Sequence, residues 1–388
     1  MKVVGIFHPC LGAGGSEACA MVLLEVLQNR CETTLVTGAP FECARLNNAY
    51  QTRVDENKIS VRIVPMPGVV REAAAGDALR GAFFARYVRK VSQDFDLCIS
   101  AYNFAPFGRP AIQFIADFSW DEEMRRAYDP VLPGLRGVMQ RPTPLRSAYL
   151  GLCDLIGGRR FDPRDHALDV VVANSRWTAD ILERRHGLRT RVIYPPVHTP
   201  SQIDWSNDSG DFVLLGRIAP EKRVVEAIEV LDRVRRRGHS FQLHIIGPMD
   251  ASEYCERVRQ AAETAGNWVR LRGALYGDDK FAELGRHTFG LHMRQREAFG
   301  IAVAEMIKMG LVPFVCAGSA PTEIVADDRL TFQDLDSAVD LIDSMLRDGA
   351  GLAETRAKLA VRADLFSTER MAAEARTLVQ EVAEWGFA

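Results

Sequence analysis

Two glutamates, Glu297 and Glu305, stand with seven residues between them in the stretch REAFGIAVAE. We expect a loop that carries Glu297 to lead into a helix whose first turn includes Phe299, Gly300 and Ile301. Backbone amides in a first turn have no partner within the helix and attract anions. Glu305 would lie one turn further, on the same face as Ile301. Such a site suits a nucleotide sugar, with amides for the diphosphate, Glu305 for a ribose diol and Glu297 for the sugar.

Apolar runs on either side of this motif predict that it connects two strands. Residues 290–293 and 311–316 are typical of buried strands, so the motif forms the crossover of a βαβ unit. Ligands of open α/β sheets bind at the carboxyl ends of the strands, where these glutamates would lie. The alternative is a helix whose glutamates only complement its dipole.

Two cations, Arg217 and Lys222, follow the apolar run of residues 211–216. A forked guanidinium and a point-like ammonium can together hold adjacent phosphate groups. They could also be surface cations near a helix start. Cations are unfavourable near a helix N-terminus unless an anion is bound there, so the pattern favours a diphosphate site.

A glycine-rich turn follows the first predicted strand, residues 2–7, and precedes a helical run that extends to about residue 30. Gly14 and Gly15 would let the backbone approach a bound group and point amides at it. The spacing is not Gly-x-Gly-x-x-Gly, so we do not expect a nicotinamide cofactor. The alternative is a tight connection with Ser16 as the helix N-cap.

Length and composition indicate a globular α/β protein with two domains. The chain has 388 residues, 47% of them hydrophobic and 26% charged, and a formal charge of −3, which argues against a nucleic-acid binder. Strands alternate with helices, which favours two parallel sheets covered on both faces. We predict domains at residues 1–203 and 204–365 and a terminal helix at 366–388. No transmembrane run, signal peptide or Cys-x-x-Cys pair is visible, so we expect a cytoplasmic protein with reduced cysteines.

The motifs resemble a known donor-site signature. Glu297 and Glu305, then Gly310 and the turn at 321–325, are similar to the signature of the family 4 retaining glycosyltransferases. That family has the GT-B fold, in which two Rossmann-like domains face each other across a cleft. The form around residues 291–301 resembles the branch of lipid-linked-oligosaccharide α-1,2-mannosyltransferases.

This resemblance implies transfer of a sugar from a nucleoside-diphosphate sugar, such as a GDP- or UDP-sugar, to an acceptor hydroxyl with retention. It implies no metal and no cofactor beyond the donor. The first domain would bind the acceptor, the second the donor, and the terminal helix would cross back to the first domain.

The resemblance also implies residue roles. Arg217 and Lys222 would bind the diphosphate and stabilise its departure, and Glu297 would orient sugar hydroxyls. Gly273, within residues 272–274, would meet the nucleobase. Gly14 and Gly15 would contact the donor phosphates or the acceptor.

Two positions depart from the family pattern. Ala116 stands where related enzymes often carry a histidine that faces the donor sugar, and Ser319 with Ala320 replaces the usual glycines. Asp117 is the nearest polar side chain to the first position. It could hydrogen-bond the acceptor hydroxyl or accept its proton, or it could cap a helix before Trp120.

A basic and apolar segment at residues 130–160 has two interpretations. It is an irregular insertion packed on the sheet, or it contacts an anionic membrane or a phosphate-bearing acceptor, which would make the protein peripheral at the inner membrane face. The departures at Ala116 and Ser319 also leave open a non-catalytic subunit that binds sugar nucleotides. A nucleotide-sugar epimerase or a phosphorylase on the same fold is the remaining alternative.

Overall fold

The computed structural model describes residues 3–12, 14–72, 76–121, 123–124, 143–158, 162–200 and 209–384. The chain divides into two compact units, Met1–Pro196 with Ser367–Ala388, and Val197–Phe366. The first boundary expected from sequence, after residue 203, lies further along the chain than the observed one. Residues 201–208, around the expected boundary, lie outside the described residues, as do residues 130–142 and 159–160 of the basic, apolar segment.

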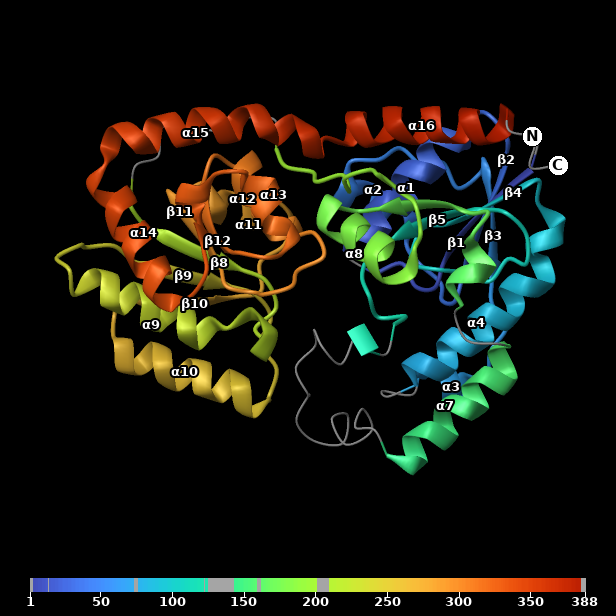
Figure 1. The fold of residues 1–388 in the computed structure, drawn as a ribbon, viewed down its shortest axis with the longest axis horizontal. Coiled ribbons are helices and arrows are strands. Elements are labelled where there is room, and N and C mark those ends of the chain that lie inside the picture. The colour runs from blue at the N-terminus through green and yellow to red at the C-terminus, as the bar shows by residue number, and fades with distance from the viewer. Residues whose placement is uncertain are drawn as a thin grey trace. The chain divides into compact units, whose positions relative to one another are not determined.

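The described residues of the first unit contain a sheet of seven parallel strands in the order β3-β2-β1-β4-β5-β6-β7 (Figure 1). The strands are β1 (Val3–His8), β2 (Glu32–Thr37), β3 (Ile59–Ile63), β4 (Leu97–Ser100), β5 (Ile112–Ile115), β6 (Val170–Ala173) and β7 (Thr190–Val192). β7 ends at Val192, shortly before Pro195 and Pro196, which lack the N–H that a strand ladder needs.

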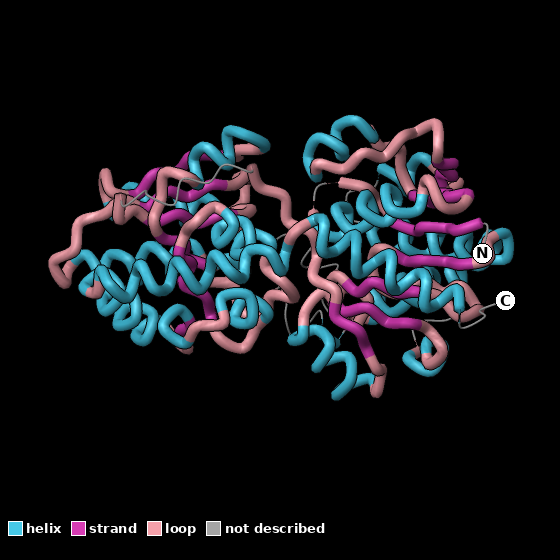
Figure 2. The backbone as a smooth tube through the Cα atoms, turned by 90° about the horizontal axis from the view of Figure 1, so that it is seen from above, coloured by secondary structure: helices cyan, strands magenta, loops and turns pink. Residues whose placement is uncertain are grey.

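Helices cover both faces of this sheet, as Figure 2 shows. They are α1 (Gly15–Leu27), α2 (Cys43–Tyr50), α3 (Gly68–Glu72), α4 (Asp77–Val91), α7 (Pro144–Gly157), α8 (Arg176–His186) and α16 (Thr368–Glu384). The N-cap of α1 is Gly14, so the alternative in which Ser16 caps this helix is wrong. Ser175 caps α8, where its Oγ accepts the Thr178 N–H at 3.0 Å.

Alternate residues of β1 contribute to two different hydrophobic clusters. Val4 and Ile6 lie in a cluster with residues of α1 and α16, and Phe7 lies in a second cluster with residues of α4. Side chains alternate between the faces of a strand, so His8 lies on the same face as Ile6. The polar end of β1 is therefore directed to the side of the sheet that α1 covers.

Helix α16 returns from the second unit to the core of the first. Met371, Ala375, Leu378, Val379 and Val382 recur at helical spacing and join the cluster of α1. Burial of a Leu or Met side chain stabilises a fold by about 1.5–3 kcal/mol, so this helix contributes substantially to the first unit.

The second unit contains, within the described residues, a parallel sheet in the order β10-β9-β8-β11-β12-β13. Its strands are β8 (Phe212–Leu215), β9 (Leu243–Ile246), β10 (Val269–Gly273), β11 (Phe289–His292), β12 (Val312–Cys316) and β13 (Thr331–Phe332). Its helices are α9 (Val224–Arg235), α10 (Glu253–Ala265), α11 (Gly277–Leu284), α12 (Ile301–Lys308), α13 (Ala320–Val325), α14 (Leu335–Arg347) and α15 (Gly349–Ala363). The expected turn at 321–325 is thus helical.

Glycines join the carboxyl ends of three strands in this sheet. Gly216 donates its N–H to Ile246 O at 2.9 Å, and Gly247 donates to Gly273 O at 2.8 Å. A Cβ atom on Gly247 would lie only 1.9 Å from Gly216 O. This close approach requires a glycine and fixes the strand ends on which the neighbouring loops are built.

No helix among the described residues is long and apolar enough to cross a membrane.

Candidate active site

An ion pair joins two of the residues singled out from sequence at the carboxyl edge of the second sheet. Lys222 ends the short 3-10 helix η3 (Pro220–Lys222), and Glu297 lies in the loop after β11. Lys222 Nζ is 3.0 Å from Glu297 Oε2, and their side chains are only 17% and 15% exposed. Because β8 and β11 are neighbours in the sheet, their loops bring the two side chains together.

Two further basic residues surround the Glu297 carboxylate. Arg294 Nη1 lies 3.4 Å from Oε1, and His292 Nε2 lies 3.6 Å from Oε2. Burial alone would raise the pKa of Glu297, but Lys222, then His292 and Arg294, hold that pKa well below its usual range. Burial lowers the pKa of His292, so this imidazole is neutral near pH 7. Two cations and one carboxylate leave a local excess of positive charge, which suits an anionic ligand.

The loop and the start of α12 are held by backbone geometry. Gly300 is the N-cap with φ of +107°, a conformation that favours glycine. A Cβ atom there would lie 2.9 Å from Pro321 Cγ. Gly300 O accepts the N–H of Val303 and of Ala304. Ile301 is the first residue of α12, and the first amides of a helix have no acceptor within it. The neighbouring Phe299 side chain is buried against Phe366, with ring centroids 5.7 Å apart.

Glu305 makes an ion pair that the sequence did not predict. Lys280 of α11 places its Nζ 2.6 Å from Glu305 Oε1, and the side chains are 19% and 13% exposed. The same Nζ lies 4.5 Å from the centroid of the Phe281 ring. Lys280 therefore fixes the Glu305 side chain, whose remaining oxygen lone pairs can accept hydrogen bonds from a diol.

Arg217 and Gly273 lie at the same edge of this sheet, each after or at the end of a strand. The Arg217 side chain is 71% exposed, and its Nη2 lies 2.8 Å from Glu221 Oε1. Gly273 ends β10 with φ of +71°. The structure thus brings Lys222 and Glu297 into contact, whereas Arg217 extends into solvent with an acidic partner.

In the first unit, the glycine-rich turn is occupied by the protein's own groups. Gly14 donates its N–H to the Tyr50 hydroxyl at 2.8 Å, and α1 begins at Gly15. Glu17 Oε1 accepts the Gly12 N–H at 3.3 Å. Of the Gly14 and Gly15 amides that we expected to face a ligand, the Gly14 amide therefore has a partner within the protein, as does the neighbouring Gly12 amide.

Asp117 belongs to a polar network that follows β4 and β5. Its Oδ2 accepts the Tyr102 hydroxyl at 3.0 Å, and its Oδ1 accepts from Asn103 Nδ2 at 2.7 Å and from the Ser119 N–H at 2.9 Å. The Ser119 bond closes an Asx turn. Residues 118–120 form a turn and not a helix, so the alternative in which Asp117 caps a helix before Trp120 is wrong. Asn174, after β6, donates to Ala116 O at 2.7 Å. These polar residues lie together at the carboxyl edge of the first sheet.

Sequence reasoning missed Lys280, Arg294 and Glu17 as members of these clusters. Arg294 precedes Glu297 by three residues and could have been found from that spacing. Lys280 is 25 residues from Glu305, and only the fold brings them together.

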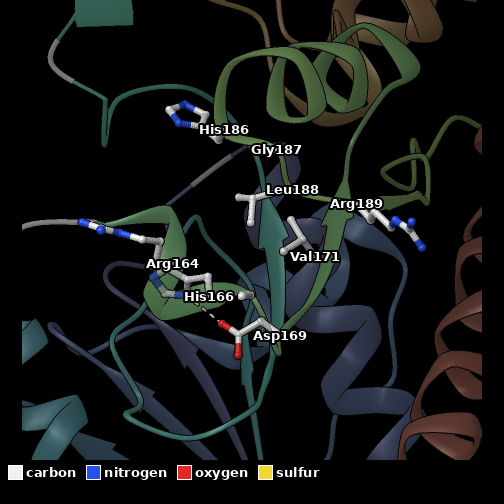
Figure 3. Close-up of a pocket in the computed structure, with 9 residues that line it drawn as sticks. Arg164, His166, Asp169, Val171, His186, Gly187, Leu188 and Arg189 are labelled. Carbon is white, nitrogen blue, oxygen red and sulfur yellow. Dashed lines mark hydrogen bonds and ion pairs between the residues drawn. The ribbon is translucent and has the colours of Figure 1, made fainter.

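A pocket of about 430 Å³ lies at the opposite, amino edge of the first sheet (Figure 3). It is lined by Arg164, His166, Ala167, Asp169, Val171, His186, Gly187, Leu188 and Arg189. His166 Nδ1 lies 2.7 Å from Asp169 Oδ2, and Asp169 also accepts from Ala111 N and Gln113 Nε2, both at 2.9 Å. Asp169 is thus saturated with protein contacts, and we interpret it as a structural link between β5 and β6.

One cluster among the described residues has the composition of a metal site. Ligand atoms of His244, Glu283 and His287 all lie within 4.8 Å of one another. Arg272 Nε is 2.9 Å from Glu283 Oε1, and Arg286 Nη1 is 3.4 Å from Oε2. These guanidinium groups already neutralise the carboxylate, so we interpret the cluster as an ion-pair network.

Comparison with protein families matches residues 199–365 to the glycosyl transferases group 1. A GDP-Man:Man(3)GlcNAc(2)-PP-Dol α-1,2-mannosyltransferase of Candida glabrata is 29% identical over 176 residues, 40% of this chain and 34% of the relative. The mouse protein of the same description is 28% identical over 162 residues, 37% of this chain and 33% of the relative. The chain aligns with about a third of the length of these curated relatives.

Solved structures are similar over nearly the whole chain. Sucrose-phosphate synthase from Thermosynechococcus elongatus gives a TM-score of 0.69 at 13% identity, with full coverage of both chains. WaaG, a glycosyltransferase involved in lipopolysaccharide biosynthesis, gives 0.65 at 16% identity, with 95% of this chain and 98% of that chain covered. These likenesses confirm the expected α/β architecture of two Rossmann-like parts, the GT-B fold.

Proposed function

We propose that this protein transfers a sugar from a nucleoside-diphosphate sugar to an acceptor hydroxyl, with retention at the anomeric carbon, because residues 199–365 match the glycosyl transferases group 1. The observation that carries the proposal is the cluster of Lys222, Arg294 and Glu297 at the carboxyl edge of the second sheet. Its excess positive charge, next to the first turn of α12, is suited to the diphosphate of a donor.

The barrier to this reaction lies in separating a negatively charged diphosphate from an oxocarbenium-like sugar. Lys222 and Arg294, with the Ile301 amide, stabilise the charge that grows on the leaving group. Arg217 is exposed on the same edge and can add a bidentate contact once it exchanges Glu221 for a phosphate. The departing phosphate oxygen takes the proton of the acceptor hydroxyl, so the reaction needs no separate general base.

Glu297 and Glu305 have separate tasks in this scheme. Glu297 is ionised, and it holds Lys222 in place while its remaining lone pairs orient the sugar hydroxyls. Glu305, fixed by Lys280, accepts from the ribose diol. Gly273, with its left-handed backbone at the end of β10, lets the chain pass close to the base.

The relatives suggest the first donor and acceptor to test. Their names specify GDP-mannose and a lipid-linked oligosaccharide, and we propose the same classes here. UDP-sugars are the second choice. We propose no metal for catalysis, since the cationic side chains and helix amides supply the electrostatic stabilisation that a metal would give.

The test is a thermal-shift screen of GDP- and UDP-sugars, followed by a transfer assay with short mannosides as acceptors. A donor at 100 times its dissociation constant should stabilise the protein by about 2.7 kcal/mol. Transfer with retained anomeric configuration supports the proposal. Binding without any turnover would favour the non-catalytic subunit, and sugar conversion without an acceptor would favour an epimerase.

We also propose that the protein contacts anionic membranes through α7. Ala148, Gly151, Leu152 and Leu155 recur at helical spacing on its exposed side, and the two leucines are 50% and 81% exposed. An apolar stripe of this kind can enter the lipid interface. Co-sedimentation with vesicles of phosphatidylcholine and phosphatidylserine tests this; we expect binding that the double change Leu152→Ser and Leu155→Ser abolishes. Equal sedimentation of both proteins would contradict the contact.

A further inference from the structure

His292 is the last residue of β11, and its imidazole is buried beside Glu297. The residue pairs with Val315 of β12 in the parallel ladder, and it is only 3% exposed. Within the described part of the chain, its Nε2 atom has no hydrogen-bond partner. Buried polar atoms without partners are uncommon, and each one calls for an explanation, which a role in the reaction can supply.

The nearest acceptor for this nitrogen is already in use. Glu297 Oε2 lies 3.0 Å from Lys222 Nζ, with which it forms the ion pair, and 3.6 Å from His292 Nε2. The second distance is too long for a normal hydrogen bond, but a shift of about 0.7 Å would make one. The imidazole therefore stands next to a carboxylate oxygen that it does not bind in this structure.

The surroundings of His292 keep its imidazole neutral in the free protein. Burial is the largest cause that lowers its pKa; the Glu297 carboxylate raises that pKa, and the cations of Lys222 and Arg294 lower it again. The neighbouring strands β8 and β12 carry no charged side chain. Burial raises the pKa of the Cys316 thiol at the end of β12, so this thiol is uncharged near pH 7.

The charged groups of α12, the helix that packs on β11, are engaged with other partners. Glu305 is paired with Lys280, and Lys308 donates to the Val197 carbonyl. The electrostatic state of His292 therefore depends chiefly on the cluster of Lys222, Arg294 and Glu297. A ligand that changes the charge of this cluster changes the proton affinity of the imidazole.

A bound donor would reverse the charge balance of the cluster. In the free protein, the cations Lys222 and Arg294 outnumber the carboxylate of Glu297. The diphosphate of a nucleotide sugar carries a negative charge on each phosphate, and in the proposed function it lies against these two cations. Added negative charge favours the protonated form of a nearby imidazole. An ammonium that shares its three donors with phosphate also leaves room at Glu297 Oε2 for a second donor.

We propose that His292 is a positioning residue for Glu297 and that it takes up a proton from solvent when the donor binds. The imidazolium then donates from Nε2 to Glu297 Oε2 and holds the carboxylate against the sugar while Lys222 serves the diphosphate. The proton returns to solvent when the nucleoside diphosphate leaves. This proposal rests on the proposed function, because it needs a diphosphate at Lys222 and Arg294.

Calorimetric titration counts this proton directly. GDP-mannose and UDP-glucose are the probes, because the diphosphate of an intact nucleotide sugar has no proton to lose near neutral pH. Titrations at pH 6.5 in buffers of different ionisation enthalpy should show a net uptake of at least about 0.3 proton per bound donor. Because the protonated protein binds the donor more tightly, donor affinity should fall as the pH rises from about 6.5 to about 8.

Two substitutions separate the charge of His292 from its shape. His292→Leu fills the buried position without a titrating group, so the proton uptake should disappear and kcat should fall by about tenfold or more, with a smaller change in donor Kd. His292→Gln restores a neutral N–H donor and should recover part of kcat but none of the proton uptake. His287→Gln is the matched control, since His287 is also 3% exposed and burial lowers its pKa too. This control should leave the uptake unchanged.

The outcomes separate this proposal from the proposed function. Donor binding without proton uptake in the wild-type protein would overturn the role of His292, and so would equal uptake in His292→Leu and His292→Gln, with folding checked by melting temperature. Unchanged kcat in folded His292→Leu would also overturn it. Uptake that both changes abolish, in a protein that transfers no sugar to any acceptor, would leave the proton site standing and remove the proposed function. A protein that binds neither nucleotide sugar would contradict both.

Discussion

Lys222 and Glu297 are 75 residues apart in the chain, and their charged atoms lie 3.0 Å apart. Each follows one of two neighbouring strands, β8 and β11, at the carboxyl edge of the second sheet. The pair is nearly buried and has Arg294 and His292 beside it. The position of the Glu297 carboxylate cannot be explained by the dipole of the following helix alone, because its nearest partners are side chains from two loops.

Glu297→Gln should keep the fold and the donor affinity and lose about 10²-fold or more in turnover. The amide retains the shape of the side chain but loses the charge that holds Lys222 and orients the sugar. Removing a negative charge also leaves the site more positive, so the donor should bind as well or more tightly. Melting temperature, donor Kd and kcat are measured on the same variant. A stable and fully active protein would remove Glu297 from the site.

Lys222→Ala should lower kcat more than donor affinity, because charge on the leaving group grows towards the transition state. Arg217→Ala should act in the same direction but less strongly, since Arg217 is 71% exposed and already paired with Glu221. Arg259→Ala, which breaks an exposed pair with Glu256, is the control. A pure loss of affinity in both variants would contradict the assigned role.

Glu305→Ala should raise the donor Kd and leave kcat nearly unchanged, because a ribose contact acts equally in the ground and transition states. Lys280→Met should have a smaller effect in the same direction, because it leaves Glu305 without its ion-pair partner. Titration with the nucleoside diphosphate alone measures both. Unchanged affinity in Glu305→Ala would show that the ribose is bound elsewhere.

Stability should fall as the pH decreases from 6.5 towards 4, in part because of His8. Burial lowers the pKa of His8 from 6.5 to about 4, so between these values the unfolded chain binds a proton that the folded one does not. The free energy of unfolding therefore decreases with falling pH, by at most about 1.4 kcal/mol per pH unit for this group. His8→Gln should reduce that slope in urea titrations at several pH values. An unchanged slope would contradict a buried neutral His8.

Leu378→Ala in α16 should destabilise the protein by about 2–5 kcal/mol, since the side chain is fully buried in the core of the first unit. Gln380→Ala on the exposed side of the same helix should change stability by less than about 0.5 kcal/mol. Equal effects in chemical denaturation would mean that α16 is not anchored as described.

The parallel α/β architecture could be predicted from the sequence. So could the position of Lys222 at the same carboxyl edge of the second sheet as Glu297. Continuous apolar runs such as residues 170–173 identify buried parallel strands, and parallel strands share one carboxyl edge. This is why residues after different strands could be assigned to one site before any distance was known.

Side-chain partners could not be predicted in the same way. Lys280 reaches Glu305 from another helix, and nothing in its local spacing indicates this. Glu17, in the first turn of α1, accepts the N–H of Gly12 in the preceding loop. Both contacts depend on side-chain direction and on loop geometry, which periodicity does not encode. Proline chemistry explains the end of β7, shortly before Pro195 and Pro196.

The return of α16 to the first unit has a consequence for how the chain is made. A ribosome completes Val197–Phe366 before it produces Thr368–Glu384. The second unit is a continuous segment and can fold as soon as it leaves the exit tunnel, whereas the first unit stays without part of its core until synthesis reaches Val382. The apolar side of α1 is therefore exposed during translation for as long as the intervening residues take to be added. The second unit therefore completes its folding before the first unit, although its synthesis begins later.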